Sequence, residues 1–205
     1  TYLNMQTGAM GPLALPVPDN QNGRIDTTLS LLLAPETHMA KNDFTANLFT
    51  RINIPIKKVI AIQVWWAPIE YFKTDTVVRD FRAARTREAT GIVTGDVYIG
   101  MLIPIVKNKK NRPELLLGIN LKIASGTGLP DARTTDSPGY FFDLSGGKDF
   151  KLNNILPRCI LRAYANTGFF VYQTNRTDYF QNDAIMFGGG LDINYKKWLF
   201  STQIA

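Results

Sequence analysis

Hydrophobic and polar residues alternate with a period of two along most of this chain. The pattern is clearest at residues 114–125, where every second position is aliphatic and the positions between are small or polar. Successive side chains of a β-strand point to opposite faces. The segment therefore predicts a strand with one aliphatic face, which includes Leu117 and Leu121, and one face that carries Asn120 and Lys122.

The same alternation predicts nine strands in all, and 1–5 is a candidate for a tenth. The predicted strands are residues 25–34, 43–53, 60–72, 93–105, 114–125, 140–150, 159–172, 185–194 and 198–204. Residues 1–24 are otherwise rich in Pro, Gly and Asn and predict an irregular N-terminal segment. Residues 35–42 predict a turn that contains His38, and a short helix is expected around 78–87.

The connections between these strands alternate in length. Long ones at residues 73–90, 125–139 and 173–183 alternate with short ones at 54–58, 107–113, 151–157 and 195–197. Short turns at one end and long loops at the other are typical of outer-membrane β-barrels, whose strands need about 9–11 residues to cross the bilayer. Aromatic residues near strand ends predict interfacial girdles. These are Trp65, Trp66, Tyr71, Phe72, Tyr140, Phe141, Phe169, Phe170, Tyr172, Tyr195 and Trp198.

The amino-acid composition excludes some classes of protein but does not distinguish a membrane β-barrel from a soluble protein. Hydrophobic residues make up 45% of the 205 residues and charged residues 20%, and no apolar run approaches the roughly 18–20 residues of a membrane helix. A β-barrel dilutes its lipid-facing residues with interior ones, so ordinary hydropathy is compatible with it. The single Cys159 excludes an internal disulfide and a thiolate metal site. The net charge of +6 favours anionic partners.

A soluble β-sandwich or lipocalin-like barrel shows the same alternation, with the aliphatic face inward. The polar faces here favour the membrane protein. They are rich in Gly, Ser, Thr, Asn, Asp, Arg and Tyr, whereas solvent-facing strands usually carry many Lys and Glu. Glu70 and Glu114 are the glutamates at strand positions, and both lie at strand ends.

Four motifs between residues 91 and 150 resemble a known family. They are Gly95-Asp96-Val97-Tyr98-Ile99-Gly100, Pro113-Glu114 leading into a strand, Ser125-Gly126-Thr127-Gly128, and a strand ending Ser145-Gly146-Gly147-Lys148-Asp149. This stretch resembles the outer-membrane proteins described as transporters of the meta-cleavage phenol degradation pathway. The long aromatic strands and Asn/Lys turns are similar to outer-membrane barrels of Bacteroidetes-type bacteria. The resemblance implies an outer-membrane location in a Gram-negative cell envelope and a channel-like role.

The expected fold is all-β: a single antiparallel up-and-down transmembrane β-barrel over residues 1–205, with about 10–12 strands in the intact protein. Such barrels usually end on an aromatic strand residue, whereas this chain ends Gln203-Ile204-Ala205. We therefore expect two or three further C-terminal strands.

The polar faces supply the candidate site, a lumen lined by polar and charged groups. The candidates are Asn47, Arg51, Asn53, Asp96, Asn120, Lys122, Asp143, Arg162, Tyr164, Asn166 and Asp192. Rings of charge set pore selectivity, which predicts a conduit for small polar, anionic or amphiphilic solutes. Arg–Asp pairs that merely fill a narrow barrel are the alternative.

Four arginines in the long loop at 73–90 are candidates for binding a partner: Arg79, Arg82, Arg85 and Arg87. Lipopolysaccharide phosphates or another envelope protein would suit them, and a solvated helix is the alternative. Nucleic acid is not expected, because the basic residues are not interleaved with aromatics on one face.

Other chemistry-bearing residues do not form a recognisable site. His38 is the only histidine and lies near Glu36 with no second ligand in sequence. The acidic residues of 131–149 lack the spacing of a calcium loop, and Gly188-Gly189-Gly190 lacks the lysine and helix of a phosphate loop. We expect no catalytic residue, metal or cofactor.

The sequence thus favours a passive outer-membrane channel that contacts outer-membrane lipid and lipopolysaccharide. Two alternatives stay open: an accessory structural barrel in a larger envelope complex, and a soluble lipid-binding β-barrel.

Overall fold

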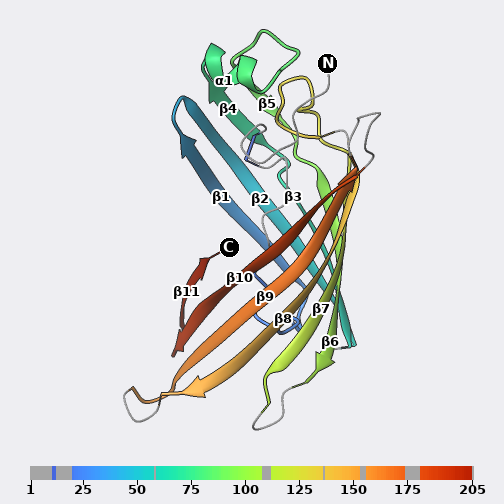
Figure 1. Cartoon of the computed structure of the whole chain (residues 1–205). Helices are drawn as coiled ribbons and strands as arrows, with labels where there is room; N and C mark the ends of the chain where they lie inside the picture. Colours follow the sequence, from blue (N-terminus) through green and yellow to red (C-terminus); the bar gives the residue numbers. More distant parts are fainter. Residues whose placement is uncertain are drawn as a thin grey trace.

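A computed structural model describes residues 11–12, 20–57, 59–107, 112–135, 137–152, 156–173 and 181–204. The candidate strand at 1–5 lies outside these ranges. The described residues form one curved antiparallel sheet and a short helix, α1 (Figure 1). The elements are β1 (Ser30–Ala40), β2 (Asp43–Ile56), β3 (Ile60–Trp66), β4 (Glu70–Thr74), α1 (Thr76–Phe81), β5 (Thr90–Val93), β6 (Val97–Val106), β7 (Glu114–Ile123), β8 (Gly139–Lys151), β9 (Cys159–Gln173), β10 (Gln181–Tyr195) and β11 (Trp198–Ile204).

The predicted antiparallel up-and-down sheet is confirmed, with 11 strands. From β6 to β11 each strand pairs with the next along the chain. Two of the predicted strands are each divided into two pieces. β3 and β4 both pair with β2. On its other side β3 pairs with β6, and β4 pairs with β5. The first interruption contains Pro68, which cannot donate a backbone hydrogen bond, and the Gly95 N–H bonds to the Ala67 carbonyl to join the two breaks.

The turn predicted at residues 35–42 is wrong. β1 runs on through Pro35 and His38 to Ala40, and the chain reverses at Asn42, which has a φ of 62°. The strand also begins later than predicted, because residues 25–28, predicted as strand, are irregular. A proline is tolerated because β1 is an edge strand. Pro35 pairs with Leu48 of β2, and no strand lies on the other side of β1 among the described residues.

The helix is shorter than predicted. The Asp75 carboxylate caps it by accepting a 2.7 Å hydrogen bond from the Val78 N–H. It ends at Phe81 with Arg82 as its C-cap, and Ala83 follows with a φ of 55°, which cannot continue a right-handed helix.

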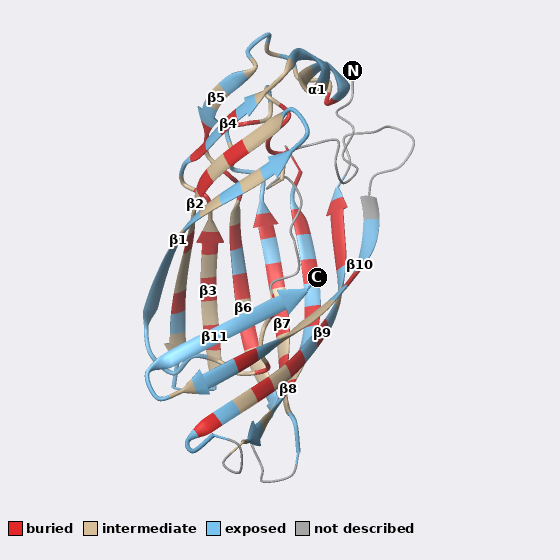
Figure 2. Ribbon diagram, turned by 90° about the vertical axis from the view of Figure 1, so that its left-hand side faces the viewer, coloured by how far each residue is buried: buried red, intermediate tan, exposed pale blue. Residues whose placement is uncertain are grey.

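The polar face of the sheet is buried and the aliphatic face is exposed. In β7, Leu116, Asn120 and Lys122 are buried, whereas Leu121 is 54% exposed. Buried and exposed positions alternate in the same way along the neighbouring strands (Figure 2). The sheet therefore curls around its polar side chains and presents aliphatic side chains on its convex face.

The predicted aromatic girdles are wrong for five of their eleven members, which are buried in the interior. Adjacent aromatics fall on opposite faces of a strand, so one residue of each pair points inward. Trp65, Phe72, Phe141, Phe170 and Tyr172 are buried. Of their partners, Tyr71, Tyr140 and Phe169 are exposed and Trp66 is half-buried. Four of these inward residues, Trp65, Phe141, Phe170 and Tyr172, form an aromatic cluster with Tyr98, in which the Trp65 and Tyr98 rings stack at 5.3 Å.

The sheet does not close into the predicted barrel. β1 and β11 are the edge strands that would have to pair to close a barrel, and no hydrogen-bonded ladder joins them among the described residues. β11 pairs with residues 189–195 of β10, and a cavity lined by residues of both β1 and β11 lies where the closing ladder would be. We call this gap the seam (Figure 1).

Candidate functional site

The candidate site is the polar interior, which we define as the buried side chains on the concave face of the sheet. Ten of the eleven candidate lumen residues are buried there and Arg51 is half-buried. The ten are Asn47, Asn53, Asp96, Asn120, Lys122, Asp143, Arg162, Tyr164, Asn166 and Asp192. Most of them bond to one another or to chain segments that fold into the interior. These partners determine which polar groups of the interior remain available to a solute.

A ring of four alternating charges holds the N-terminal segment 20–28 against the sheet. Arg162 contacts Asp149 at 2.7 Å and Glu114 at 2.8 Å. Arg24, from the segment, contacts Asp149 at 2.7 Å and also pairs with Glu114. Partial burial lowers the pKa of the Arg24 guanidinium, but hydrogen bonding and attraction from both carboxylates outweigh this and raise it above its ordinary value. Arg24 therefore stays charged in the ring.

The backbone of this segment touches the backbone of β8 where both carry glycine. Gly23 has a φ of 81°, and a Cβ at this position would lie 2.7 Å from the Gly147 nitrogen. A Cβ on Gly147 would in turn lie 2.3 Å from the Asn22 carbonyl oxygen. The same oxygen accepts a 2.8 Å hydrogen bond from Arg162 Nε. No larger residue fits this contact without moving the segment.

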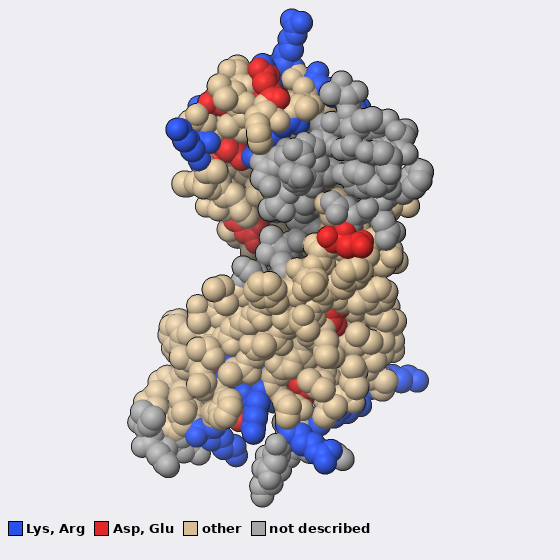
Figure 3. All heavy atoms as spheres, viewed as in Figure 1, with Lys and Arg blue, Asp and Glu red and all other residues tan. Residues whose placement is uncertain are grey.

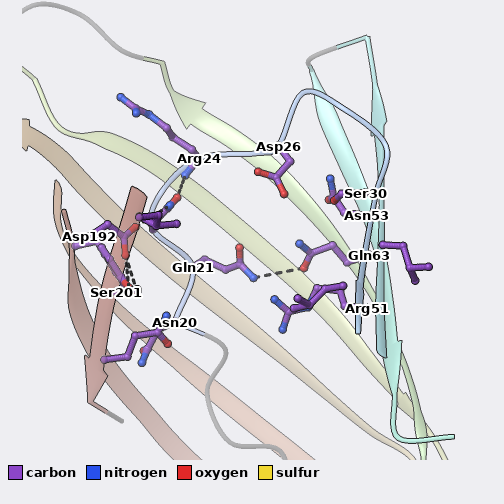
Figure 4. Close-up of a pocket in the computed structure, with 16 residues that line it drawn as sticks. Asn20, Gln21, Arg24, Asp26, Ser30, Arg51, Asn53, Gln63, Asp192 and Ser201 are labelled. Atoms are coloured by element: carbon purple, nitrogen blue, oxygen red, sulfur yellow. Dashed lines mark hydrogen bonds between the residues drawn. The ribbon is translucent and has the colours of Figure 1, made fainter. Parts of the chain in front are cut away.

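The segment also reaches strands far apart in the sheet. Asn22 donates to Asp192 of β10 at 3.3 Å, and Gln21 donates to Gln63 of β3 at 3.4 Å (Figure 4). Asn20 donates to the Ile204 carbonyl of β11 at 3.1 Å. Ile25 packs against a buried cluster of Ala61, Leu102 and Leu116. The segment therefore fills part of the interior from one side to the other.

A cavity of about 450 Å³ lies at the seam beside this segment (Figure 4). Its charged lining is balanced, with two guanidinium groups, Arg24 and Arg51, and two carboxylates, Asp26 and Asp192. Amides supply much of the rest: Asn20, Gln21, Asn22, Asn53, Gln63 and Gln203. Such a lining offers hydrogen bonds without a net charge.

The described residues of the long loop, 125–135 and 137–138, fold into the other end of the interior. Lys122 pairs with Asp96 at 2.6 Å and donates to Thr135 and the Ser137 carbonyl of this loop. Asp96 in turn accepts hydrogen bonds from the Ser125 and Gly126 N–H groups. The side chains of Lys122 and Asp96 are at most 1% exposed.

Arg133 inserts deepest from this loop. Its side chain is fully buried, pairs with the equally buried Glu70 at 2.7 Å and lies 5.0 Å above the Phe72 ring. It also contacts Asp43 at 3.4 Å, and Asp43 pairs with Arg82 at 2.7 Å. Sequence reasoning missed Arg133 and Glu70, and it missed the charge ring partners Arg24, Glu114 and Asp149. Their pairing joins segments far apart in the chain, and period-two patterning carries no signal for it.

The four candidate loop arginines do not form one surface. Arg82 is buried against Asp43, and Arg79 pairs with Asp80 at 2.8 Å. Arg85 and Arg87 are exposed. At most two of the four are thus presented to a partner.

The remaining candidates show no reactive arrangement. His38 lies in β1, where its Nε2 is 3.8 Å from Glu36. Within the described ranges, no three or more His, Cys, Asp or Glu side chains are grouped to hold a metal ion. Gly188, Gly189 and Gly190 lie inside β10, and a Cβ on Gly190 would lie 2.6 Å from the Tyr164 hydroxyl. Gly188 and Gly190 permit close packing in the interior. Asp136 is outside the described residues.

The helix content offers no membrane segment: none of the helices in the described part of the chain is both long enough and apolar enough to span a bilayer. No family model, curated protein or solved structure matches this chain.

Proposed function

We propose that this chain is an outer-membrane β-sheet protein with an occluded interior, acting as an accessory or structural barrel wall in the cell envelope. The inverted distribution of side chains carries the proposal: aliphatic residues on the exposed convex face and charged residues on the buried concave face. A soluble protein would bury the aliphatic face. The same inversion opposes the soluble lipid-binding barrel, whose apolar face would line the inside.

The exposed side chains on the convex face are large and contiguous along neighbouring strands. Ile185 and Phe187 of β10 are 77% and 73% exposed, and Leu121, Phe142 and Leu144 continue the surface across β7 and β8. Contiguous apolar surfaces of this kind are rare on soluble monomers. Strands of 10–15 residues, the lengths of β6 to β10, suffice to cross a bilayer at a steep tilt.

Occlusion is supported by what fills the interior. Segment 20–28 spans one end, the loop at 125–138 enters the other, and the aromatic cluster lies within. The charges of Arg162, Lys122 and Arg133 are paired with carboxylates, so they favour the filled-barrel alternative over a selectivity ring. No catalytic step is proposed.

A passive channel is the second candidate, and the cavity at the seam favours it. Its balanced, amide-rich lining suits small neutral polar solutes better than anions. Conduction through it would require segment 20–28 to move, because that segment forms one wall of the cavity.

Conductance in planar lipid bilayers tests both candidates, with Gly147→Ala and Gly146→Ala as a matched pair. The Gly147 Cβ collides with the Asn22 backbone, whereas the Gly146 Cβ meets the movable end of Leu115 at 3.0 Å on the other face. We expect the wild type and Gly146→Ala to insert without steady conductance. Gly147→Ala displaces segment 20–28 and should give conducting steps.

Steady conductance of the wild type would contradict occlusion and support the channel. Failure of the wild type to enter any bilayer or detergent micelle, with solubility in buffer alone, would contradict the membrane proposal itself.

A further inference from the structure

The two ends of the sheet differ in charge. The short connections at residues 54–60, 107–113, 151–158 and 194–198 contain no Asp or Glu, yet hold ten of the 23 Lys and Arg residues of the chain. The described residues of these connections follow β2, β6, β8 and β10 and therefore lie at the same end of the up-and-down sheet.

Seven exposed cations in the described parts of these connections define what we call the basic rim: Lys57, Lys107, Arg112, Lys151, Arg158, Lys196 and Lys197. Within the described ranges no carboxylate pairs with any of them. The nearest acidic residues in sequence, Glu114 and Asp149, are engaged by the guanidinium groups of Arg24 and Arg162. These two carboxylates are thus neutralised inside the sheet by Arg24 and Arg162, and they do not pair with the cations of the rim.

The opposite end of the sheet carries exposed charges of both signs. Exposed cations such as Lys73 and Arg85 share it with Asp80 and Glu88, and Arg79 pairs with Asp80. Figure 3 shows this difference on one face of the molecule, with acidic and basic atoms together above and basic atoms along the lower edge.

The basic rim borders the apolar convex face directly. Ile56 and Val59 flank Lys57, and Trp198 follows Lys197, with all three apolar side chains exposed. Two lysines near this border lie over aromatic rings: Lys196 is 5.0 Å from the Tyr195 ring and Lys148 is 5.8 Å from the Phe150 ring. Lysine stems on apolar surface with the ammonium at the polar edge, next to interfacial aromatics, are the arrangement found at a bilayer headgroup layer.

We propose that the basic rim binds the anionic headgroups of glycerophospholipids in the leaflet that faces the short turns. This rests on the proposed membrane location and adds a leaflet preference to it. Charge complementarity selects the phosphodiester headgroups of anionic lipid, because the cations follow the perimeter of the lipid-facing surface. An acidic protein would be contacted from the end of the sheet and would not need cations beside exposed Phe150 and Trp198.

The test is lipid enrichment on the intact protein. The wild type is inserted into vesicles of phosphatidylcholine mixed with phosphatidylglycerol, extracted gently, and the bound lipids are counted by native mass spectrometry. The rim variant changes Lys57, Lys151, Lys196 and Lys197 to Gln. The matched control makes the same change at four exposed cations of the opposite end, Lys41, Lys73, Arg85 and Arg87.

We expect the wild type and the control to retain phosphatidylglycerol over phosphatidylcholine. In the rim variant the ratio of bound phosphatidylglycerol to bound phosphatidylcholine should be lower by about tenfold or more. The enrichment should also fall with salt. Equal enrichment in the rim variant and the wild type overturns the proposal.

Insertion into pure phosphatidylcholine vesicles separates this inference from the proposed function. Insertion without any phosphatidylglycerol preference overturns the basic rim and leaves the membrane proposal standing. Failure to insert into either vesicle overturns both.

Discussion

Replacing Arg133 with methionine removes one charge from a fully buried pair. The guanidinium lies 2.7 Å from Glu70, and both side chains are 0% exposed, so solvent does not screen the carboxylate that is left behind. Breaking a buried pair by removing one partner typically costs about 3–5 kcal/mol. The loss stays in this range because Asp43, the other carboxylate near Arg133, keeps Arg82 at 2.7 Å.

Equilibrium urea unfolding in detergent micelles, followed by tryptophan fluorescence, measures this loss. The double variant Glu70→Gln/Arg133→Met removes both charges and should recover about 2 kcal/mol relative to Arg133→Met alone. A loss below about 1 kcal/mol for Arg133→Met, or no recovery in the double variant, would refute the reasoning that an unpaired buried carboxylate causes the destabilisation.

Three further changes probe other parts of the molecule by urea unfolding, in vesicles for Leu121 and in detergent micelles for the other two. Leu121→Arg, on the convex face, should cost about 2–4 kcal/mol in vesicles and more than Leu121→Ala; an equal or smaller cost would argue against a lipid-facing position. Lys122→Met should cost about 1–3 kcal/mol, less than Arg133→Met, because Asp96 keeps two backbone N–H donors; a larger loss than for Arg133→Met would count against this ranking. Asp192→Ala removes the acceptor of Asn22, Tyr164 and Ser201 and should cost about 1–3 kcal/mol while speeding amide exchange in β11; unchanged exchange would show that β11 does not depend on this carboxylate.

Strand positions and faces could be predicted from the sequence because a period of two is a local property. In β7 the alternation alone separates Leu121 from Asn120 and Lys122, and the structure places them on opposite faces. The ends of the strands could be predicted less accurately. Pro35 indicates a turn in isolation, but on an edge strand its missing N–H costs no ladder bond, so β1 continues to Ala40.

The filling of the interior could not be predicted, because it depends on contacts between distant segments. Glu70 and Arg133 are 63 residues apart, and each alone is unremarkable in sequence. Likewise, the Pro- and Gly-rich composition before residue 24 indicates irregular chain but does not show that Gly23 fits against Gly147. The aromatic pairs were open to prediction: adjacent rings on a strand must face opposite ways, which assigns one of Trp65 and Trp66 to the interior.

Whether the sheet closes into a barrel also cannot be predicted from the local pattern of alternating residues. The alternation specifies the ladders between neighbouring strands, but whether β1 meets β11 depends on the curvature of the whole sheet and on what lies between the edges. In this structure Leu32 of β1 and Leu199 of β11 line the cavity at the seam.

The environment of single spin labels on the convex face tests the account most directly. With Cys159 replaced by serine, labels at Leu117→Cys and Leu121→Cys in β7 are compared in vesicles with a label at Lys197→Cys on the basic rim. The account predicts that the two β7 labels collide more often with oxygen, which concentrates in hydrocarbon, than with a water-soluble nickel complex, and that the rim label shows the reverse. Stronger collision of the β7 labels with the nickel complex would place the aliphatic face in water and contradict the membrane location.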